Sequence, residues 1–271
     1  METLQPKPVQ PPKTIGLALS GGAVRGAAHV GVLEVLEREG IRVDMVAGTS
    51  VGAIVGAAHA AGLGATEIGR VFRSSRWPSM ARLSLRGKYS LFDTRPMEQT
   101  LEEHLGLTTF DELEIPFAAV SCDLVTGQEI IFRSGHLPTA LRASSAVPGI
   151  FPPVRTGGRL LVDGCVVNNL PVDVVRGMGA DYVIAVDLIP PPAGERVPKN
   201  YLELMVVAGY LWSRANHPDP ATIDCHIVPQ VGQYLGWDFR TAPEIEELGR
   251  AAAEAVLPQL RRDLGGVRTK E

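Results

Sequence analysis

The fold begins in residues 15–62, which read IGLALSGGAVRGAAHVGVLEVLEREGIRVDMVAGTSVGAIVGAAHAAG. Two short apolar runs, at residues 15–19 and 43–47, each lead into a glycine-containing turn, as buried strands do. The apolar spacing after each turn predicts a helix, one ending near Glu39 and the other near Ala61. The order strand, helix, strand, helix indicates a parallel sheet with crossover helices.

The α/β pattern continues along the rest of the chain. Strand-like runs at residues 117–122 and 129–132 flank a turn, which suggests a β-hairpin. We also expect strands at residues 160–162 and 182–188, and helices at residues 94–104, 137–145, 202–213 and 243–264 and from residue 171.

No internal repeat and no clear linker interrupts residues 14–265, so we expect one domain there. Residues 1–13 are rich in proline and lack the apolar run of a signal peptide, and we expect a flexible tail. A second short tail is expected at residues 266–271. Residues 190–242 are largely proline-rich and irregular, and whether they form a lid stays open.

The composition excludes several classes of protein. Hydrophobic residues make up 45% and charged residues 21%, which excludes a disordered chain, a coiled coil and a collagen-like fibre. The net charge of −4 argues against a nucleic-acid partner. The three cysteines form neither a disulfide framework nor a zinc-type spacing, so we expect a reducing cytoplasm and no metal or cofactor. No apolar stretch reaches the roughly 20 residues of a membrane span, so any membrane contact should be peripheral.

A G-x-S-x-G motif occupies residues 48–52, between the second apolar run and the alanine-rich helix. A nucleophilic serine must project from a sharp strand-to-helix turn, and Gly48 and Gly52 leave the space for it. Ser50 is therefore our candidate nucleophile. The alternative is a serine that only caps the following helix.

A serine hydroxyl needs a general base. None of the six histidines lies on a strand-end loop beside a glycine, so a Ser-His-Asp triad is unsupported (His29, His59, His104, His136, His217 and His226). Asp163 ends an apolar run and precedes Gly164. Ligand sites of parallel α/β sheets lie at the carboxyl ends of strands, so we expect Asp163 beside Ser50. A helix-cap or turn role for Asp163 is the alternative.

A third feature is the glycine turn SGGAVRG at residues 20–26, which also follows a strand and opens a helix. The backbone N–H groups of such a turn can bind an anion. That anion could be a nucleotide phosphate or an ester oxyanion, and the neighbouring Ser50 favours the oxyanion. The turn fits neither the dinucleotide-binding nor the P-loop motif.

Four segments of the chain form a joint pattern: GLALSGGAVRGAAHVGVLEVLEREGI, DMVAGTSVGAIVGAAHAAG, ASSAVPGIFPPV and LVDGCVVNNLPV. In this order they resemble the patatin-like phospholipases, and they look most similar to the bacterial branch that is similar to the neuropathy target esterase catalytic domain. The resemblance covers about residues 14–188. It implies a three-layer α/β/α fold around a mostly parallel central sheet.

The resemblance also implies a Ser–Asp dyad without histidine. Ser50 matches the family nucleophile and Asp163 matches the Asp of its D-G-G/A motif. Gly21, Gly22 and Ala23 match the oxyanion loop, and Arg25 matches its basic residue; together these four form the expected oxyanion and substrate-binding set. The sequence departs from the pattern at Ala23, in place of a third glycine, and at Cys165, which follows Asp163-Gly164.

The function expected from these residues is a lipid acyl hydrolase acting on phospholipid or lysophospholipid esters through acyl-Ser50. Acyl transfer from the same intermediate is one alternative, and a nucleotide-binding or regulatory α/β protein is another. The basic stretch Arg70–Lys88 contains no acidic residue and is a candidate for peripheral contact with anionic lipid, at the inner face of the membrane. A solvated helix face and loop is the alternative for that stretch. The sequence specifies neither the lipid head group nor the oligomeric state.

Overall fold

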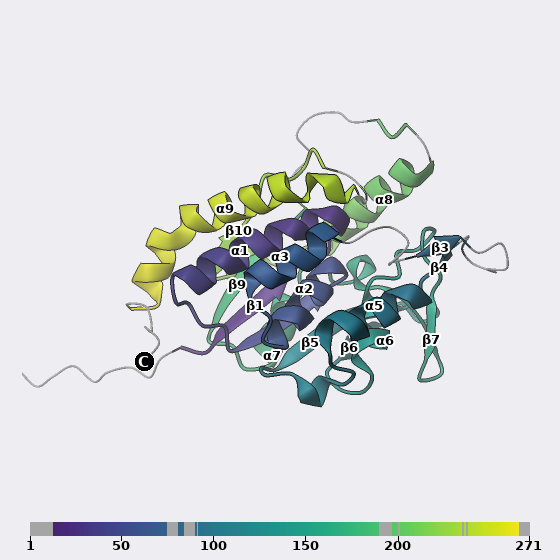
Figure 1. Cartoon of the computed structure of the whole chain (residues 1–271), viewed down its shortest axis with the longest axis horizontal. Coiled ribbons are helices and arrows are strands. Elements are labelled where there is room, and N and C mark those ends of the chain that lie inside the picture. The colour runs from purple at the N-terminus through teal and green to yellow at the C-terminus, as the bar shows by residue number, and fades with distance from the viewer. Residues whose placement is uncertain are drawn as a thin grey trace, which may run out of the picture.

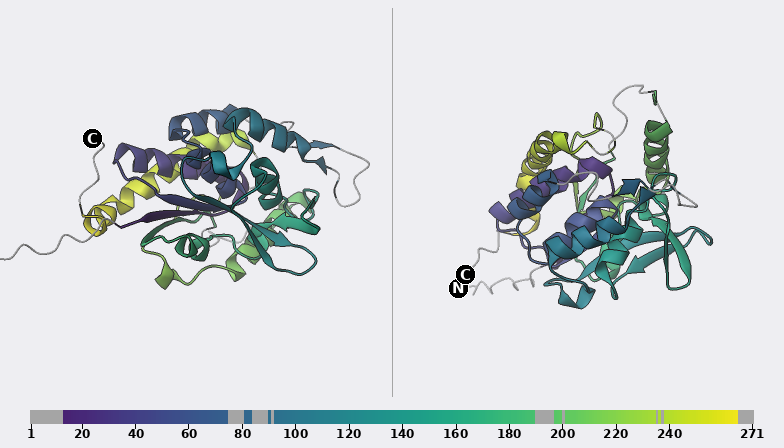
Figure 2. Two further views of the ribbon diagram at one scale, coloured as in Figure 1. Left: turned by 90° about the horizontal axis from the view of Figure 1, so that it is seen from below. Right: turned by 45° about the vertical axis from the view of Figure 1, so that its right-hand side comes forward.

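A computed structural model of the chain describes residues 13–74, 81–83, 90, 92–189, 197–199, 201–234, 236 and 238–265. In this part of the chain a mostly parallel sheet lies between layers of helices, which is the expected three-layer α/β/α architecture (Figure 1, Figure 2). The expected tails lie outside the described residues, except for Lys13. None of the described helices is long and apolar enough to span a membrane.

The sheet has the strand order β10-β9-β1-β2-β5-β8-β7, and β6 also pairs with β5. The strands are β1 Ile15–Leu19, β2 Met45–Thr49, β5 Phe117–Asp123, β6 Glu129–Phe132, β7 Val154–Thr156, β8 Arg159–Asp163, β9 Tyr182–Val186 and β10 Cys225–Ile227. The run from β10 to β5 is parallel, whereas β6 and β8 are antiparallel to β5. The predicted hairpin is therefore confirmed as β5 and β6.

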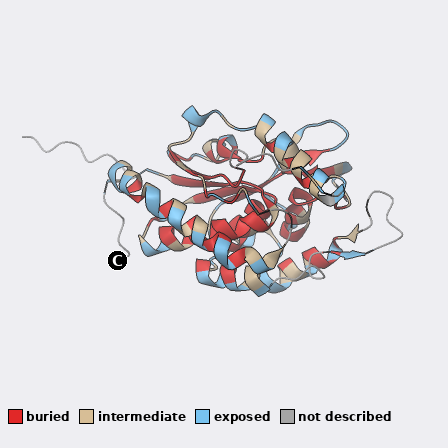
Figure 3. Cartoon of the chain, turned by 90° about the horizontal axis from the view of Figure 1, so that it is seen from above, coloured by how far each residue is buried: buried red, intermediate tan, exposed pale blue. Residues whose placement is uncertain are grey.

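Alternate residues of the strands supply two cores, one on each face of the sheet. Leu17 and Leu19 face the larger core, whereas Ala18 faces the smaller one, because side chains of a strand alternate between faces. The larger core packs under α1 Ala27–Arg38, α2 Val51–Ala60, α3 Ala65–Ser74, α5 Arg95–Leu105, α6 Leu137–Ser144 and α9 Ala242–Asp263, and the smaller under α7 Val172–Gly177. Buried residues accordingly concentrate in the sheet and on the helix sides that face it (Figure 3).

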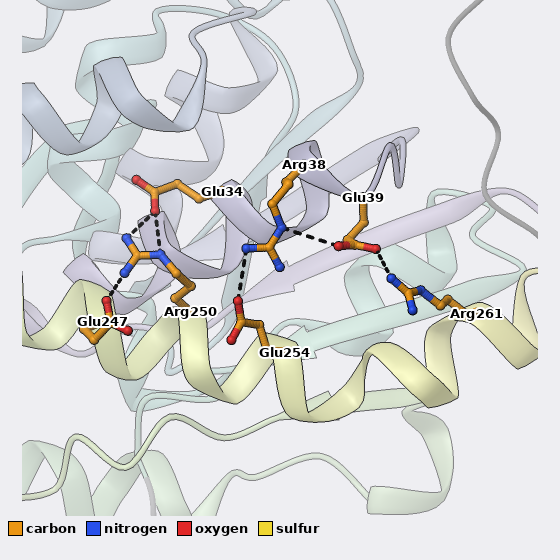
Figure 4. Close-up of polar contacts among 7 residues, drawn as sticks. All are labelled: Glu34, Arg38, Glu39, Glu247, Arg250, Glu254 and Arg261. Carbon is orange, nitrogen blue, oxygen red and sulfur yellow. Dashed lines mark hydrogen bonds and ion pairs between the residues drawn. The ribbon is translucent and has the colours of Figure 1, made fainter.

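Helices α1 and α9 lie against each other at very close range. A Cβ at Gly31 would stand 2.0 Å from the Glu246 carbonyl oxygen, and a Cβ at Gly249 would stand 2.0 Å from that of Ala28. Two ion pairs bridge the two helices, Glu34–Arg250 at 2.5 Å and Arg38–Glu254 at 3.0 Å, and a third joins Glu39, the residue after α1, to Arg261 at 2.6 Å (Figure 4). The two glycines set the distance between the helices, because a Cβ at either position would clash with the other helix. The ion pairs are partly exposed to solvent and add little to stability.

The edge of β5 beside β2 brings two strand ends together. Val120 pairs with Thr49 of β2, and the next residue, Ser121, pairs with Asp163 of β8. Since β6 occupies the other edge of β5, β2 and β8 share this edge and meet end to end. The Ser121 hydroxyl donates to the Val162 carbonyl at 2.6 Å and fixes this arrangement.

Asp163 does not end a parallel strand, which corrects the geometry that we expected from the sequence. Strand β8 is not one of the parallel strands. It begins beyond the carboxyl edge of the parallel strands and runs back toward them, so its last residue arrives level with the end of β2.

Several elements differ from the expectation. The first helix starts at Ala27, after a 3₁₀ turn at Ala23–Gly26, and the second strand is shifted to Met45–Thr49. Helix α3 overlaps the start of the basic stretch, where we named a helix face only as the alternative, and β10 lies in the region predicted to be irregular. A two-stranded ribbon, β3 Arg82–Leu83 and β4 Phe92–Asp93, was not predicted either. Helix α8, Tyr201–Ala215, confirms the helix expected there.

Candidate active site

Ser50 lies in a strained turn between β2 and α2. Its φ of 55° and ψ of −124° are unfavourable for a residue with a side chain. A Cβ at Gly48 would stand 2.4 Å from the Gly52 carbonyl oxygen, and a Cβ at Gly52 would stand 2.3 Å from that of Leu19. Both glycines are therefore required for the turn. The Ser50 side chain makes no capping hydrogen bond to α2, which argues against the helix-cap alternative.

Ser144, at the end of α6, holds this turn in place. The Ser50 backbone N–H donates to the Ser144 hydroxyl at 2.9 Å, and that hydroxyl donates to the Val120 carbonyl at 2.5 Å. The residue connects α6, the serine turn and β5 within the protein interior. Sequence reasoning assigned Ser144 no role, because its two bonds span 94 and 24 residues.

Asp163 is fully buried and offers one unused oxygen. Its Oδ1 accepts a hydrogen bond from the Cys165 N–H at 2.8 Å, whereas Oδ2 has no hydrogen-bond partner among the described residues. A Cβ at Gly164 would stand 2.5 Å from the Val120 carbonyl oxygen, so the glycine allows this close turn. A buried carboxylate oxygen without a partner costs folding free energy. Such oxygens are rare in proteins, and a functional role is one explanation for them.

Burial raises the pKa of Asp163 to about 6. The Cys165 N–H and the nearby Ser50 hydroxyl oppose this rise, since both stabilise the charged form. The carboxyl is thus a much stronger base than a solvent-exposed aspartate, while it is still largely ionised at neutral pH. Burial also raises the pKa of the adjacent Cys165 thiol, which favours an unreactive thiol.

The glycine turn after β1 lies beside these two residues, and Gly21, Gly22 and Ala23 line the same pocket. The Gly21 N–H donates to the Asn169 carbonyl at 3.3 Å. No hydrogen bond from the N–H groups of Gly22 and Ala23 to a described residue is found. These two amides are therefore the better candidates for binding an oxyanion.

Ala23 occupies a backbone conformation that favours glycine, with φ at 54°. We expect Ala23→Gly to raise the free energy of unfolding by about 0.5–1 kcal/mol, because relief of this strain outweighs the greater flexibility of the unfolded chain. Denaturant unfolding measures the change. Ala255→Gly, in the exposed middle of α9, serves as the control and should lower stability by about 1 kcal/mol. A destabilised Ala23→Gly protein would contradict the assigned strain.

Arg25 does not line the pocket, although it was expected in the oxyanion and substrate-binding set. Its guanidinium donates to the carbonyls of Tyr234, Leu188 and Gly232 at 2.8–3.1 Å, and it lies over the Tyr210 ring. The side chain is 4% exposed. These contacts hold the glycine turn against the surrounding segments. Arg25 therefore positions the turn and does not contact the pocket.

All six histidines lie in the described part of the chain, and none of them makes a hydrogen bond to Ser50 or Asp163 there. His29 is buried behind the glycine turn, where its Nε2 lies 2.8 Å from the Ser20 carbonyl oxygen and burial lowers its pKa to about 4. His104 lines the pocket from α5. His217 and His226 lie beside Asp187 instead. The geometry thus offers Asp163 as the partner of Ser50.

The pocket that contains Ser50 and Asp163 has apolar walls. Its lining includes Ile54, Val55 and Ala58 of α2, Ile68, Val71 and Phe72 of α3, Met97, Leu101 and Leu105 of α5, and Met205, Val206 and Tyr210 of α8. No lysine or arginine is among the described residues that line it. The buried side chain of Asn169 also lines the pocket, and its Oδ1 is unpartnered among the described residues.

A serine held in a sharp turn between a strand and a helix is typical of serine hydrolases with α/β folds. Residues 17–176 match the profile of the patatin-like phospholipase family. The chain therefore belongs to this family. The match contains the glycine turn, Ser50 and Asp163.

Related proteins extend the comparison. The NTE family protein Rv1063c of Mycobacterium tuberculosis is 37% identical over 183 residues, 66% of this chain and 50% of the relative. Neuropathy target esterase sws of Drosophila melanogaster is 35% identical over 183 residues, 65% of this chain and 13% of the relative. The chain thus spans about half the length of the mycobacterial relative.

Among solved structures, VipD from Legionella pneumophila superposes with a TM-score of 0.62 at 13% identity, over 92% of this chain and 67% of VipD. ExoU from Pseudomonas aeruginosa, in complex with SpcU, superposes with a TM-score of 0.54 at 17% identity, over 94% of this chain and 53% of the matched chain. These likenesses confirm the fold class.

Proposed function

We propose that the chain is a lipid acyl hydrolase that uses Ser50 as nucleophile and Asp163 as general base. The observation that carries the proposal is the free Oδ2 of a buried carboxyl, close to a strained serine in one apolar pocket. Membership of the patatin-like phospholipase family supports it. The substrate class is a carboxylic ester of a lipid, with phospholipids and lysophospholipids as the first candidates.

In the proposed mechanism the Ser50 oxygen attacks the ester carbonyl while Asp163 takes the hydroxyl proton. The N–H groups of Gly22 and Ala23 stabilise the oxyanion, and Gly21 can add a third donor only by releasing the Asn169 carbonyl. Asp163 then gives its proton to the leaving alcohol, and acyl-Ser50 forms. Water attacks this acyl group with Asp163 again as the base, which releases the fatty acid and restores the hydroxyl of Ser50.

A fluorophosphonate probe tests the nucleophile directly. The probe should label Ser50 in the wild-type chain, lose that label in Ser50→Ala, and keep it in Ser145→Ala, which removes another hydroxyl of the same pocket. Mass spectrometry of products from a panel of phospholipids, lysophospholipids and triglycerides then identifies the substrate. Absence of labelling at Ser50 would contradict the proposal.

Two alternatives remain testable with the same samples. Acyl transfer would appear as a new ester when an alcohol or lysolipid is added, because that acceptor replaces water at acyl-Ser50. A nucleotide-binding role is disfavoured by the apolar walls and by the lack of lysine and arginine among the described lining residues. Equilibrium dialysis against ATP would support that role if binding were lost on substitution of Gly22.

The pH dependence of hydrolysis should report the basicity of Asp163. Its pKa of about 6 means that the base becomes protonated as the pH falls, so kcat/KM should decrease about tenfold per pH unit below about pH 6. A pH–rate profile with a soluble ester measures this limb. A profile that is level from pH 7 to pH 4 would contradict Asp163 as the base.

The apolar pocket should select for long acyl chains. Ala58 lines the pocket on α2, about 12 Å along the helix from Ser50. Ala58→Trp should therefore lower kcat/KM for long-chain esters at least about tenfold and leave acetate esters nearly unchanged. Ala251→Trp, on the exposed side of α9, is the size-matched control. Equal losses with both ester lengths would show that the pocket does not hold the chain.

Peripheral membrane contact is also a proposal. Residues 75–80 and 84–89 of the basic stretch lie outside the described residues, and Arg70 forms an ion pair with Glu67. Helix α8 adds support, because one side of it lines the pocket while Leu204 and Leu211 are exposed on the opposite side, and Trp212 is also partly exposed. Sedimentation with anionic and neutral vesicles tests the contact, and no binding to either would refute it.

A further inference from the structure

Three metal-ligating side chains meet at the end of the sheet, apart from Ser50 and Asp163. Asp187 directly follows β9, His226 lies in the adjacent β10, and His217 lies two residues beyond the end of α8. The Asp187 Oδ2 lies 2.9 Å from the His217 Nε2 and 3.8 Å from the His226 Nε2. One ligand atom from each residue fits within 4.8 Å of the other two.

Hydrogen bonding indicates which atoms of these residues are free to bind a cation. The His217 Nδ1 lies 3.0 Å from the Pro218 carbonyl oxygen, which only accepts, so Nδ1 must carry the proton. In a neutral ring, Nε2 then presents a lone pair to Asp187. The His226 Nε2 is buried without a hydrogen-bond partner and faces the same carboxylate oxygen. Such a convergence of acceptor atoms requires a positive charge between them, either a proton or a metal ion.

The distances suit a tetrahedral metal ion. Zinc binds histidine nitrogen and carboxylate oxygen at about 2.0–2.1 Å, which places neighbouring ligand atoms about 3.3 Å apart. The two measured separations, 2.9 and 3.8 Å, lie on either side of that value. The histidine side chains are 30% and 33% exposed, whereas that of Asp187 is 5% exposed. The site thus has a buried anionic ligand and access for water as a fourth ligand.

Groups around the three ligands orient them as metal-site neighbours do. The Pro218 carbonyl fixes the tautomer of His217, and the Ile189 N–H donates to the Asp187 Oδ1 at 2.9 Å. The second bond leaves Oδ2 for the cation. Two histidines and a carboxylate favour Zn²⁺ or a similar transition-metal ion over Mg²⁺ or Ca²⁺, which prefer oxygen ligands alone.

We propose that Asp187, His217 and His226 bind one divalent transition-metal ion, with Zn²⁺ as the best-fitting candidate. The ion would connect the segment after α8 to the ends of β9 and β10. Since α8 forms one wall of the apolar pocket, the ion would stabilise that wall. None of the three ligands lines the pocket, so the role is structural and independent of the proposed hydrolase mechanism.

Zinc binding by the untagged full-length chain tests this proposal. After treatment with a chelator, isothermal titration with Zn²⁺ should show one site per chain, and Zn²⁺ should raise the unfolding temperature. His226→Gln and Asp187→Asn should each weaken binding at least about 100-fold. His136→Gln is the matched control, because His136 also lies beside a carboxylate, that of Glu102 at 3.4 Å, and it should bind as the wild type does.

Cobalt substitution gives a readout that does not depend on any variant. Co²⁺ in the wild-type chain should show the visible absorption of a tetrahedral site without the strong near-ultraviolet band of a thiolate ligand. A thiolate band would assign the metal to a cysteine and overturn the proposal. Failure of the wild-type chain to bind Zn²⁺, or equal binding by His226→Gln, would also overturn it and would leave a proton as the cation between these residues.

Discussion

Ser50→Ala is expected to lower kcat/KM for lipid esters by about 10⁴-fold or more, because no acyl-enzyme can form without the hydroxyl. The folded structure should remain intact. The side chain of Ser50 makes no capping hydrogen bond, and this chain already holds an alanine at a similar backbone angle, Ala23 with φ at 54°. Initial rates with a phospholipid substrate measure the loss, and thermal unfolding measures the stability.

The control for this variant must remove a hydroxyl from the same pocket without touching the nucleophile. Ser145→Ala does so, since the Ser145 hydroxyl is buried and has no hydrogen-bond partner among the described residues. We expect its rate to remain within a few-fold of wild type. Normal turnover by Ser50→Ala would exclude Ser50 as the nucleophile, whatever the result for Ser145→Ala.

The serine turn of the site could be predicted from residues that are neighbours in the sequence. The strand before Ser50, the glycines around it and the helix after it follow from residues adjacent in sequence, because a sharp turn needs small neighbours. The structure places Ser50 in that turn, at a φ that side chains rarely adopt. The helices and strands that the sequence did predict end within a few residues of the expected bounds for the same reason, whereas α3, β3, β4, β7 and β10 were not predicted.

Long-range pairing explains what could not be predicted. The sequence indicates that a strand ends at Asp163, but the direction of β8 depends on its pairing with Ser121, 42 residues earlier. Ser144 acts through hydrogen bonds to distant residues, and Asp187 meets His217 and His226 only because β9, β10 and the segment after α8 converge. None of these contacts forms a motif of fixed spacing.

Strain and desolvation concentrate at the candidate site. The two described residues other than glycine with positive φ are Ser50 and Ala23, and both line the pocket. Asp163 adds a carboxylate oxygen that is buried without a partner. The strained backbone and the unpaired carboxylate oxygen each cost folding free energy. The surrounding glycines and Ser144 hold the strained serine turn in place. A site of this kind should become more stable when its reactive groups are removed.

Asp163→Asn is therefore expected to lower kcat/KM by about 10³-fold and to stabilise the protein at the same time. The folded-state pKa of about 6 lies above the ordinary value of 3.8, so proton binding stabilises the folded state at low pH. That contribution is lost as the pH rises from about 4 to about 6. At pH 7 the ionised wild type should be less stable than the neutral variant by up to about 3 kcal/mol.

Denaturant unfolding of both proteins between pH 3.5 and pH 8 tests this sign. The two stabilities should converge near pH 3.5, where the wild-type carboxyl is also neutral, and should separate as the pH rises. Asp181→Asn is the opposite control: hydrogen bonds from Thr14 lower the pKa of that exposed carboxyl, so its removal should not stabilise the protein at neutral pH. If Asp163→Asn were inactive but less stable than wild type at pH 7, the carboxylate would be well solvated or paired in solution. A pKa raised by burial could then no longer explain its basicity.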